Sequence, residues 1–399
     1  MTIKFDFGNL GGICLIDLSD VRKEILRELS EIMLIVMILL IGVALRLAAI
    51  AFSENTQYKP VDVYYADTQA SKLILNLENP YTHTYLIHGY TLDLFAYLPL
   101  VPIYYALFVP LGDIRYGSIF ADVVIMFSIY LIAKTNRHGI SFYAPLAFAI
   151  FPASIWLTSV ASTNIMIGCA FLTLSMAALL REKYAAAAFF FGLGIAANQL
   201  VVIALPMIGL YLWKQHKFSR FMLALLVPSA VVLPFFLASP SRFIYQVILF
   251  QFERGLQPDG LFSLYRIVQV FSGIQLDSWL RVTILLGITG IIVVAYTRKP
   301  NFFVPLSGVL LFAGAFVLPI NGFWNYFLPA CAVACAVIPS INDEIDQKTA
   351  KIKWWPRIPW SAPVVTGREQ KPSCFCTSKK KHVLQCSSQV WKAKRLIDV

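Results

Sequence analysis

Charged side chains are scarce in this sequence. Of its 399 residues only 14% are Asp, Glu, Lys or Arg, while 58% are hydrophobic, and the mean hydropathy is +0.69. This composition excludes a single water-soluble core and is typical of a chain that crosses a membrane many times. The net charge of +11 does not indicate nucleic acid binding, because 12 of the 33 Lys and Arg residues lie after residue 339 and most others lie in short turns between apolar runs. That distribution is typical of cytoplasmic membrane flanks.

Cysteine frameworks and metal-binding patterns are also lacking. Cys169, Cys331 and Cys335 fall within apolar runs, so no disulfide scaffold is predicted. The chain has no HExxH and no Cys-x-x-Cys spacing, and we therefore expect neither a metal nor a cofactor. His83 and His88 stand in a polar stretch, where solvated loop histidines are the favoured interpretation. Potential zinc ligands gather only in the tail. The Cys-x-Cys spacing there is tighter than that of structural zinc sites, so it is a weak signal. These residues are Cys374, Cys376, His382 and Cys386.

Long apolar runs predict an all-α polytopic membrane protein with about ten transmembrane helices. Positive charges gather in the turns at 134–137, 181–183, 214–220 and 298–299, which the positive-inside bias assigns to the cytoplasm. Under that constraint the run at 97–112 cannot be a full span, and both termini are cytoplasmic. The expected spans are 32–52, 116–133, 141–158, 162–180, 219–238, 280–297, 302–318 and 323–339, with two shorter runs between 184 and 213 that meet at Asn198 and Gln199.

This topology divides the chain into three parts. Residues 1–31 form a cytoplasmic segment whose charges are unlike those of a short cleavable signal, so we expect the first helix to stay as an anchor. Residues 32–339 form the transmembrane domain, with external loops at about 53–115 and 239–279. Residues 340–399 form a basic, poorly ordered cytoplasmic tail. Since most acidic residues of the domain fall in the external loops, the working surface of this plasma-membrane protein is expected to face outward.

The polar stretch 61–90 directly follows the first span. Taken as a helix beginning near Pro60, it has an apolar stripe flanked by Asp62 and Asp67, which lie about 140° apart. Two carboxylates so placed do not converge on one bond, as a glycoside hydrolase requires. We predict one reactive carboxylate and one with another role; the alternative is that both are solvated interfacial charges. The stripe consists of Val63, Ala66, Ala70, Ile74 and Leu77.

The same stretch carries a resemblance to a known family. Its pattern, with the motifs that follow it, resembles the first external loop of the GT-C membrane glycosyltransferases, in particular the polyprenol-phosphate-mannose-dependent branch similar to glycosyltransferase family 87. The resemblance is strongest over 58–135 and extends loosely, by helix layout, to 339. It rests on Asp62, Tyr64, Tyr65, Ala70, Leu73, Asn79-Pro80-Tyr81, Tyr97-Leu98-Pro99-Leu100 and Gly112-Asp113-Ile114-Arg115.

The resemblance implies an inverting glycosyltransferase. It would move a hexose, with mannose expected, from a polyprenyl or dolichyl phosphate to a glycan or glycolipid acceptor at the outer face. The family's catalytic base maps to Asp62, by its distance from Asn79-Pro80-Tyr81, with Asp67 as the second candidate. The chemistry agrees, because an acceptor hydroxyl needs a base whereas a phosphate leaving group needs no proton, so one carboxylate suffices. Membrane lipids are the other expected partners.

A donor phosphate at the membrane surface requires a partner such as an external arginine. The resemblance favours Arg254, which lies in a Phe-x-x-x-Arg-Gly stretch, and Arg115 is a second candidate. Where the resembled enzymes have a basic residue between the two short runs, this chain has Asn198 and Gln199, so Gln199 is expected to hydrogen-bond the phosphate. The alternatives are that the arginines anchor helices to lipid headgroups and that the amides cap helices.

Several aromatic and amide side chains are expected to shape the substrate cavity. Those near the candidate base are Tyr64, Tyr65, Asn79 and Tyr81, and those at the start of the last span are Trp324 and Tyr326. The latter two match an interfacial aromatic belt equally well.

Two other functions fit the same composition. A transporter or flippase for a lipid-linked glycan would line the bilayer midplane with polar groups, whereas here Arg46 and Asp122 are the charged residues clearly within predicted spans. Because the polar residues gather at one face, the sequence favours the enzyme. An inactive scaffold with the same fold is the third alternative.

Overall fold

The computed structural model describes residues 2–6, 13–56, 58, 60–87, 90–135, 142–253, 262–298, 303–319 and 323–337. Contacts divide the chain into a small unit, residues 1–30 with 352–399, and a large unit, residues 31–351. The small unit contains a hairpin that the sequence did not predict, in which β1 (Thr2–Asp6) pairs antiparallel with β2 (Ile13–Asp17). The tail at 340–399, with its candidate zinc ligands, lies outside the described residues.

The first helix, α1 (Leu18–Glu54), begins well before residue 32, the predicted start of the first span. Arg27 stands four residues before Glu31, a spacing at which opposite charges stabilise a helix. The charged segment is therefore helical and continuous with the apolar one. The stretch Arg22–Glu54 is long and apolar enough to cross a membrane.

The long apolar helices of the chain fall on the predicted apolar runs. Within the described residues, four helices are long and apolar enough to span a membrane, and a fifth span results if two helices bent by 48° count as one. Shorter apolar helices lie on the remaining predicted runs, so the chain is an all-α polytopic membrane protein, as predicted. The long helices are Arg22–Glu54, Arg115–Thr135, Phe218–Ala238 and Ser278–Thr297, the bent pair is Tyr143–Ala149 with Pro152–Val160, and the shorter ones are Ile165–Leu180, Tyr184–Ala197, Gln199–Lys214, Phe303–Val317 and Asn325–Val337.

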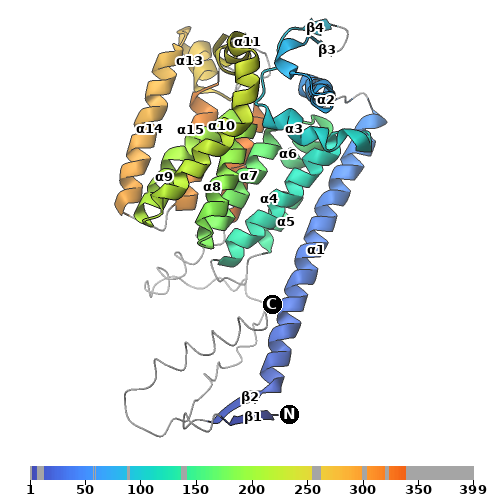
Figure 1. The fold of residues 1–399 in the computed structure, drawn as a ribbon, viewed down its shortest axis with the longest axis vertical. Helices are drawn as coiled ribbons and strands as arrows, with labels where there is room; N and C mark the ends of the chain where they lie inside the picture. The colour runs from blue at the N-terminus through green and yellow to red at the C-terminus, as the bar shows by residue number, and fades with distance from the viewer. Residues whose placement is uncertain are drawn as a thin grey trace. The chain divides into compact units, whose positions relative to one another are not determined.

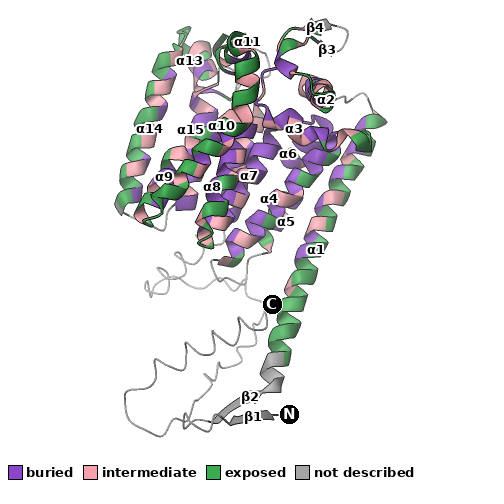
Figure 2. Ribbon diagram, in the orientation of Figure 1, coloured by how far each residue is buried: buried purple, intermediate pink, exposed green. Residues whose placement is uncertain are grey.

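Three helices form the centre of the large unit, α4 (Arg115–Thr135), α7 (Ile165–Leu180) and α8 (Tyr184–Ala197). They lie side by side (Figure 1), and α4 and α7 are mostly buried (Figure 2). Small residues allow such close approach, which is the usual way that helices associate in a membrane. Around them lie α5 (Tyr143–Ala149), α6 (Pro152–Ile155), the π-helical turn η3 (Trp156–Val160), η4 (Gln199–Ala204), α9 (Leu205–Lys214), η5 (Phe218–Arg220), α10 (Phe221–Ala238), α14 (Ser278–Arg298), α15 (Phe303–Val317) and η8 (Trp324–Phe327).

The two predicted external loops pack against each other. Gln246 joins them, because its side chain accepts a hydrogen bond from the Phe95 N–H at 3.0 Å and donates to the Tyr81 carbonyl at 3.3 Å. The run at 97–112 forms no spanning helix, as predicted, since its helix α3 has only 7 residues. The elements are α2 (Asp62–Leu75), η1 (Pro80–Thr82), β3 (Tyr85–Ile87), β4 (Tyr90–Leu92), α3 (Leu100–Ala106) and η2 (Val109–Leu111) in the first loop, and α11 (Pro240–Ile244), the π-helical turn η6 (Tyr245–Leu249), α12 (Phe250–Glu253) and α13 (Leu264–Ser272) in the second.

Candidate functional site

Both candidate acids lie on α2, which begins at Asp62, just after the predicted start. The preceding residue, Val61, is extended and donates its N–H to the Ala161 carbonyl at 3.1 Å. Asp62 therefore occupies the first turn, where the helix dipole favours a carboxylate. It accepts a hydrogen bond from the Val63 N–H at 2.9 Å, and it is half-buried, so it keeps contact with solvent.

The buried face of α2 overlaps the predicted apolar stripe only in part. Ala66, Asp67, Ala70 and Ser71 are buried, whereas Leu77, a member of the predicted stripe, is 96% exposed. Small side chains let this face pack closely against its neighbours, and that packing encloses an aspartate. The apolar periodicity thus found part of the buried face, Ala66 and Ala70, but it did not show that Asp67 and Ser71 are enclosed beside them.

Asp67 is fully buried and lies against a polar residue from a distant part of the chain. Its Oδ2 accepts a hydrogen bond from the Asn164 amide at 3.1 Å, while its Oδ1 has no hydrogen-bond partner among the described residues. Burial raises the pKa of Asp67 well above its ordinary value; the Asn164 hydrogen bond opposes this rise and the Asp62 charge adds to it. The protonated form is therefore favoured.

Asn164 belongs to an irregular connection between η3 and α7. Trp156–Val160 is a π-helical turn, and Ser162, at φ +54°, has a left-handed conformation that costs energy for a residue other than glycine. Strained backbone of this kind often marks a functional site. The sequence analysis did not single out this connection; the available signal was a run of five hydroxyl and amide residues within 158–164, between two apolar stretches.

Arg115, a predicted phosphate ligand, is already bonded through all three guanidinium nitrogens. Its Nε donates to Asp113 Oδ2 at 2.6 Å, one terminal nitrogen donates to Ser53 Oγ at 3.2 Å, and the other to Glu54 Oε1 at 2.6 Å. The residue is only 5% exposed. Two carboxylates thus neutralise its charge, and a phosphate would have to displace one of them.

Tyr64 and Tyr65 lie beside this cluster with ring centroids 5.3 Å apart. The Tyr64 hydroxyl donates to Asp113 Oδ1 at 3.3 Å, and Arg115 lies over its ring at 5.6 Å. Burial, and then the Asp113 charge, raises the pKa of Tyr64 to about 12. Both tyrosines are half-buried, so each presents an edge to solvent near the start of α2.

Tyr81 is not at the surface of a cavity, as was predicted, but in the packed interior of the first loop. It is 0% exposed, its ring centroid lies 4.8 Å from that of Phe243, and its hydroxyl donates to the Tyr97 carbonyl at 2.6 Å. Asn79 caps the short turn that carries it, accepting a hydrogen bond from the Tyr81 N–H at 3.1 Å. Both residues therefore hold the loop together.

Gln199 stands where the two short runs meet. Its side-chain amide lies 3.4 Å from the carbonyls of Ala96 and Val247, to which it donates, so it links the first loop with the second. The neighbouring Asn198 caps η4 by accepting a hydrogen bond from the Leu200 N–H at 2.8 Å. The capping interpretation is thus confirmed for Asn198.

The remaining predicted residues are partly outside the described part of the chain. Arg254, His88 and the side chain of Trp324 lie outside it, while the Tyr326 ring packs against Phe323 at 5.8 Å. His83 pairs with Glu78 at 3.1 Å. The described residues contain no group of three His, Cys, Asp or Glu side chains placed to share an ion.

A buried arginine that the sequence analysis missed is Arg281, near the start of α14. It is 1% exposed, stands 5.3 Å from the centroid of the Tyr265 ring and donates to Ser278 Oγ at 2.9 Å and to the Leu318 carbonyl. Its position falls within the predicted span 280–297 and outside the predicted external loop 239–279.

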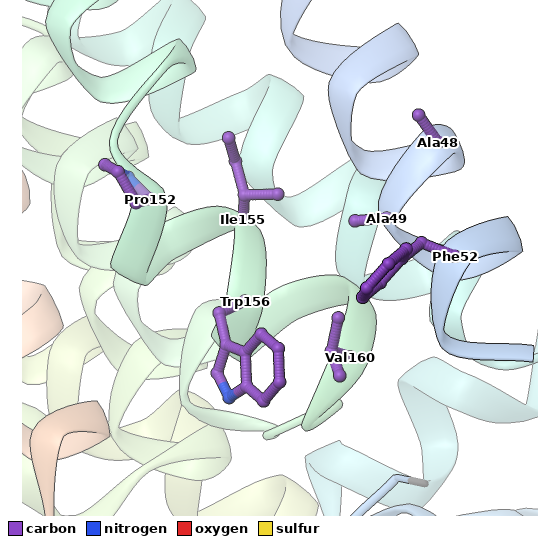
Figure 3. A pocket seen from close by; sticks show the side chains of 7 residues that line it. All are labelled: Ala48, Ala49, Phe52, Pro152, Ile155, Trp156 and Val160. Atoms are coloured by element: carbon purple, nitrogen blue, oxygen red, sulfur yellow. The ribbon is translucent and has the colours of Figure 1, made fainter. Parts of the chain in front are cut away.

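An apolar hollow of about 390 Å³ lies between α1 and the bent helix pair (Figure 3). Val160, one of its lining residues, is adjacent in sequence to Ala161, the residue that accepts the hydrogen bond from Val61. The hollow is lined by Ala48, Ala49, Phe52, Pro152, Ile155, Trp156 and Val160.

No protein-family model and no curated protein sequence matches the chain. Solved structures similar to it include two of ArnT from Cupriavidus metallidurans, one bound to undecaprenyl phosphate and one in the apo state. Each is 16% identical to this chain and covers 78% of it, with TM-scores of 0.47 and 0.49. The chain covers 61% of the length of these ArnT structures.

Proposed function

We propose that this chain is an inverting membrane glycosyltransferase that moves a hexose from a polyprenyl or dolichyl phosphate to a glycan or lipid acceptor at the outer face of the plasma membrane. Mannose is the proposed sugar. The proposal rests on the loop pattern that resembles the GT-C enzymes and on the chemistry of the residues around the start of α2.

The observation that carries the proposal is the placement of Asp62. This carboxylate stands outside the predicted spans, in the first turn of a helix that is tied to the transmembrane core through Val61 and Ala161, and it keeps contact with solvent. A general base must reach the proton it removes, and of the two candidate acids only Asp62 is in contact with solvent. Asp67 is fully buried, so we assign it another role.

The reaction follows from one accessible carboxylate. Asp62 takes the proton of an acceptor hydroxyl, whose oxygen attacks the anomeric carbon from the face opposite the phosphate. The new glycosidic bond forms as the bond from the anomeric carbon to the phosphate oxygen breaks, and the polyprenyl phosphate leaves with the electron pair. Attack from the opposite face inverts the anomeric configuration.

The lipid substrate needs a hydrocarbon path and a phosphate partner. The apolar lining of the hollow beside α1 suits a hydrocarbon chain. Arg254 remains the proposed phosphate ligand, with Gln199 as a hydrogen-bonding neighbour. Arg115 is a weaker candidate because Asp113 and Glu54 already neutralise it.

The test is transfer by the purified full-length protein. We expect radiolabelled sugar to move from a polyprenyl phosphate to an acceptor from the host membrane, and Asp62→Asn to lower the rate about 10²-fold to 10⁴-fold, the usual contribution of a general base. Asp93→Asn is the matched control, because exposed Asp93 accepts a hydrogen bond from Thr84 Oγ1 and an amide oxygen can do the same. Equal rates for Asp62→Asn and wild type would exclude Asp62 as the base.

The rival function, transport of a lipid-linked glycan, is less well supported. Arg46 and Asp122, two charged residues deep within the spans, are bonded to each other, and Ser154 and Thr158 also bond to this pair. Such a pair is structural rather than a passage for polar cargo. If liposomes containing the protein moved a labelled lipid-linked glycan across the bilayer without any sugar transfer, the transporter would replace the enzyme.

A further inference from the structure

We propose that Asn164 is a positioning residue: by donating its amide hydrogen bond to the Asp67 carboxyl group, it keeps the first two turns of α2 in place so that Asp62 faces its substrate. This inference rests on the proposed function and deepens it. It adds the pair Asn164 and Asp67 to the proposed site, in which Asp62 is the base.

Two hydrogen bonds hold α2 to the connection, one on each side of Asp62 in the sequence. Before it, the Val61 N–H donates to the Ala161 carbonyl at 3.1 Å; after it, Asp67 Oδ2 accepts from the Asn164 amide at 3.1 Å. Both partners come from the same short connection, 161–164. Since Asp62 and Asp67 are separated by about 7.5 Å along the helix axis, the two hydrogen bonds set the direction of the helix and not only the position of its end.

The surroundings of Asp67, in contrast to its hydrogen bond with Asn164, favour a neutral acid. The titratable groups that interact electrostatically with Asp67 are Asp62 on its own helix, Tyr81 in η1, Tyr85 in β3 and Tyr105 in α3, and the pKa of each tyrosine is raised chiefly by burial. None of these groups is a cation, and no described Lys, Arg or His forms an ion pair with Asp67. A buried carboxylate without a cation is costly, whereas a carboxylic acid bonded to an amide is not.

The connection that carries Asn164 is held in a costly conformation. Ser162 has a positive φ, and the π-helical turn Trp156–Val160 precedes it, with the Thr163 N–H donating to the Leu157 carbonyl at 2.9 Å. Such a conformation persists only where the surrounding contacts enforce it. The hydrogen bonds to Val61 and Asp67 are two of those contacts. Each of the two segments, α2 and the connection, therefore stabilises the conformation of the other.

The first test compares removal of the amide with a matched change nearby. Asn164→Ala should lower kcat about 10-fold to 100-fold, because a misplaced reacting group costs up to that much, with little change in the KM for the donor. Ser159→Ala is the control, since Ser159 is buried in the π-helical turn that precedes this connection and its hydroxyl has no partner among the described residues. An Asn164→Ala variant that is folded and as active as Ser159→Ala overturns the proposal.

The second test changes Asp67 and Asn164 so that a hydrogen bond between them can still form. Asp67→Asn should retain activity within about threefold of wild type, because two amides form a neutral hydrogen bond of similar strength. The double variant Asp67→Asn with Asn164→Asp, in which the acid and the amide change places, should also retain activity within about threefold. Asn164→Asp alone puts two acids together, so its activity should fall, relative to wild type, as the pH rises and both ionise. An Asp67→Asn variant as inactive as Asp62→Asn, or a wild-type pH profile for Asn164→Asp, overturns the inference.

The two proposals fail in different ways. If wild type transfers no sugar from any polyprenyl phosphate, the proposed function fails and with it the role of Asn164. If wild type is active and Asp62→Asn is not, the function stands, and the Asn164 variants decide the positioning role alone.

Discussion

Asp62 and Asp67 are five positions apart on one helix and differ chiefly in their contact with solvent. Asp62 is half-buried in the first turn, whereas Asp67 is enclosed and bonded to Asn164. Helical periodicity showed that the two do not face each other, but it could not show which one is enclosed. That depends on the connection 156–164, which is distant in sequence and folds against α2.

The pH dependence of stability should report the state of Asp67. Because its pKa in the folded chain is raised above the ordinary value of 3.8, the folded chain binds more protons than the unfolded chain above that pH. The free energy of unfolding contributed by this group therefore falls as the pH rises from 3.8 through the folded pKa. Asp67→Asn removes this titration, so the melting temperature of the variant in detergent, relative to that of wild type, should rise over the pH range from 3.8 upward. A constant difference across this range would contradict the raised pKa.

The ion pair between Arg46 and Asp122 should be important for stability. Both residues are 0% exposed, and Arg46 also donates to the carbonyls of Gly42 and Ala149, each at 3.0 Å. Arg46→Leu leaves the carboxylate without its cation and should destabilise the protein by about 3 kcal/mol. The double variant Arg46→Leu with Asp122→Leu should recover part of this loss.

The control for this pair is Arg242→Leu, which removes an exposed arginine that donates to the Thr82 carbonyl at 3.2 Å. Thermal unfolding in detergent measures all of these variants. Equal melting temperatures for Arg46→Leu and Arg242→Leu would show that the buried pair contributes nothing.

At the scale of elements, close approach of α7 and α8 depends on glycine. A Cβ at Gly168 would lie 2.5 Å from Asn198 Cβ, an atom that no side-chain rotation can move away. Gly168→Ala should therefore push the helices apart and cost about 1–3 kcal/mol. Gly287→Ala in α14 is the control, because nothing lies within 4 Å of its added Cβ. A Gly168→Ala variant as stable as Gly287→Ala would contradict this packing.

The loops show where sequence periodicity is insufficient. The pattern predicted a helix after the first span, and α2 forms there. It did not predict that Gln246 from the second loop would bond to the Tyr81 carbonyl and the Phe95 N–H, since such contacts join positions far apart in the sequence. Tyr81 was consequently predicted at a cavity, whereas it is part of the interior.

At the scale of the whole molecule, the distribution of basic residues predicts which loops face outward. In intact cells a membrane-impermeant maleimide should label Leu77→Cys, at a residue 96% exposed, and should label Lys183→Cys, at an exposed residue in a basic turn, only after permeabilisation. The parent chain, with its own cysteines, supplies the background. The opposite pattern would place α2 in the cytoplasm and exclude an outer active site.

The sequence by itself determined the class of the protein and the positions of its helices. Apolar runs must become helices in a bilayer, because no other structure that they can form there satisfies the backbone hydrogen bonds. Composition also determined that the polar residues gather outside those runs. These properties are local, so the sequence was sufficient for them.

Only the tertiary structure decided how individual polar residues are used. It placed Arg115 between two carboxylates, enclosed Asp67 against Asn164 and left Asp62 in contact with solvent. The physical reason is that burial and neutralisation depend on neighbours from distant parts of the chain. The same aspartate is a base or a structural acid according to what packs against it.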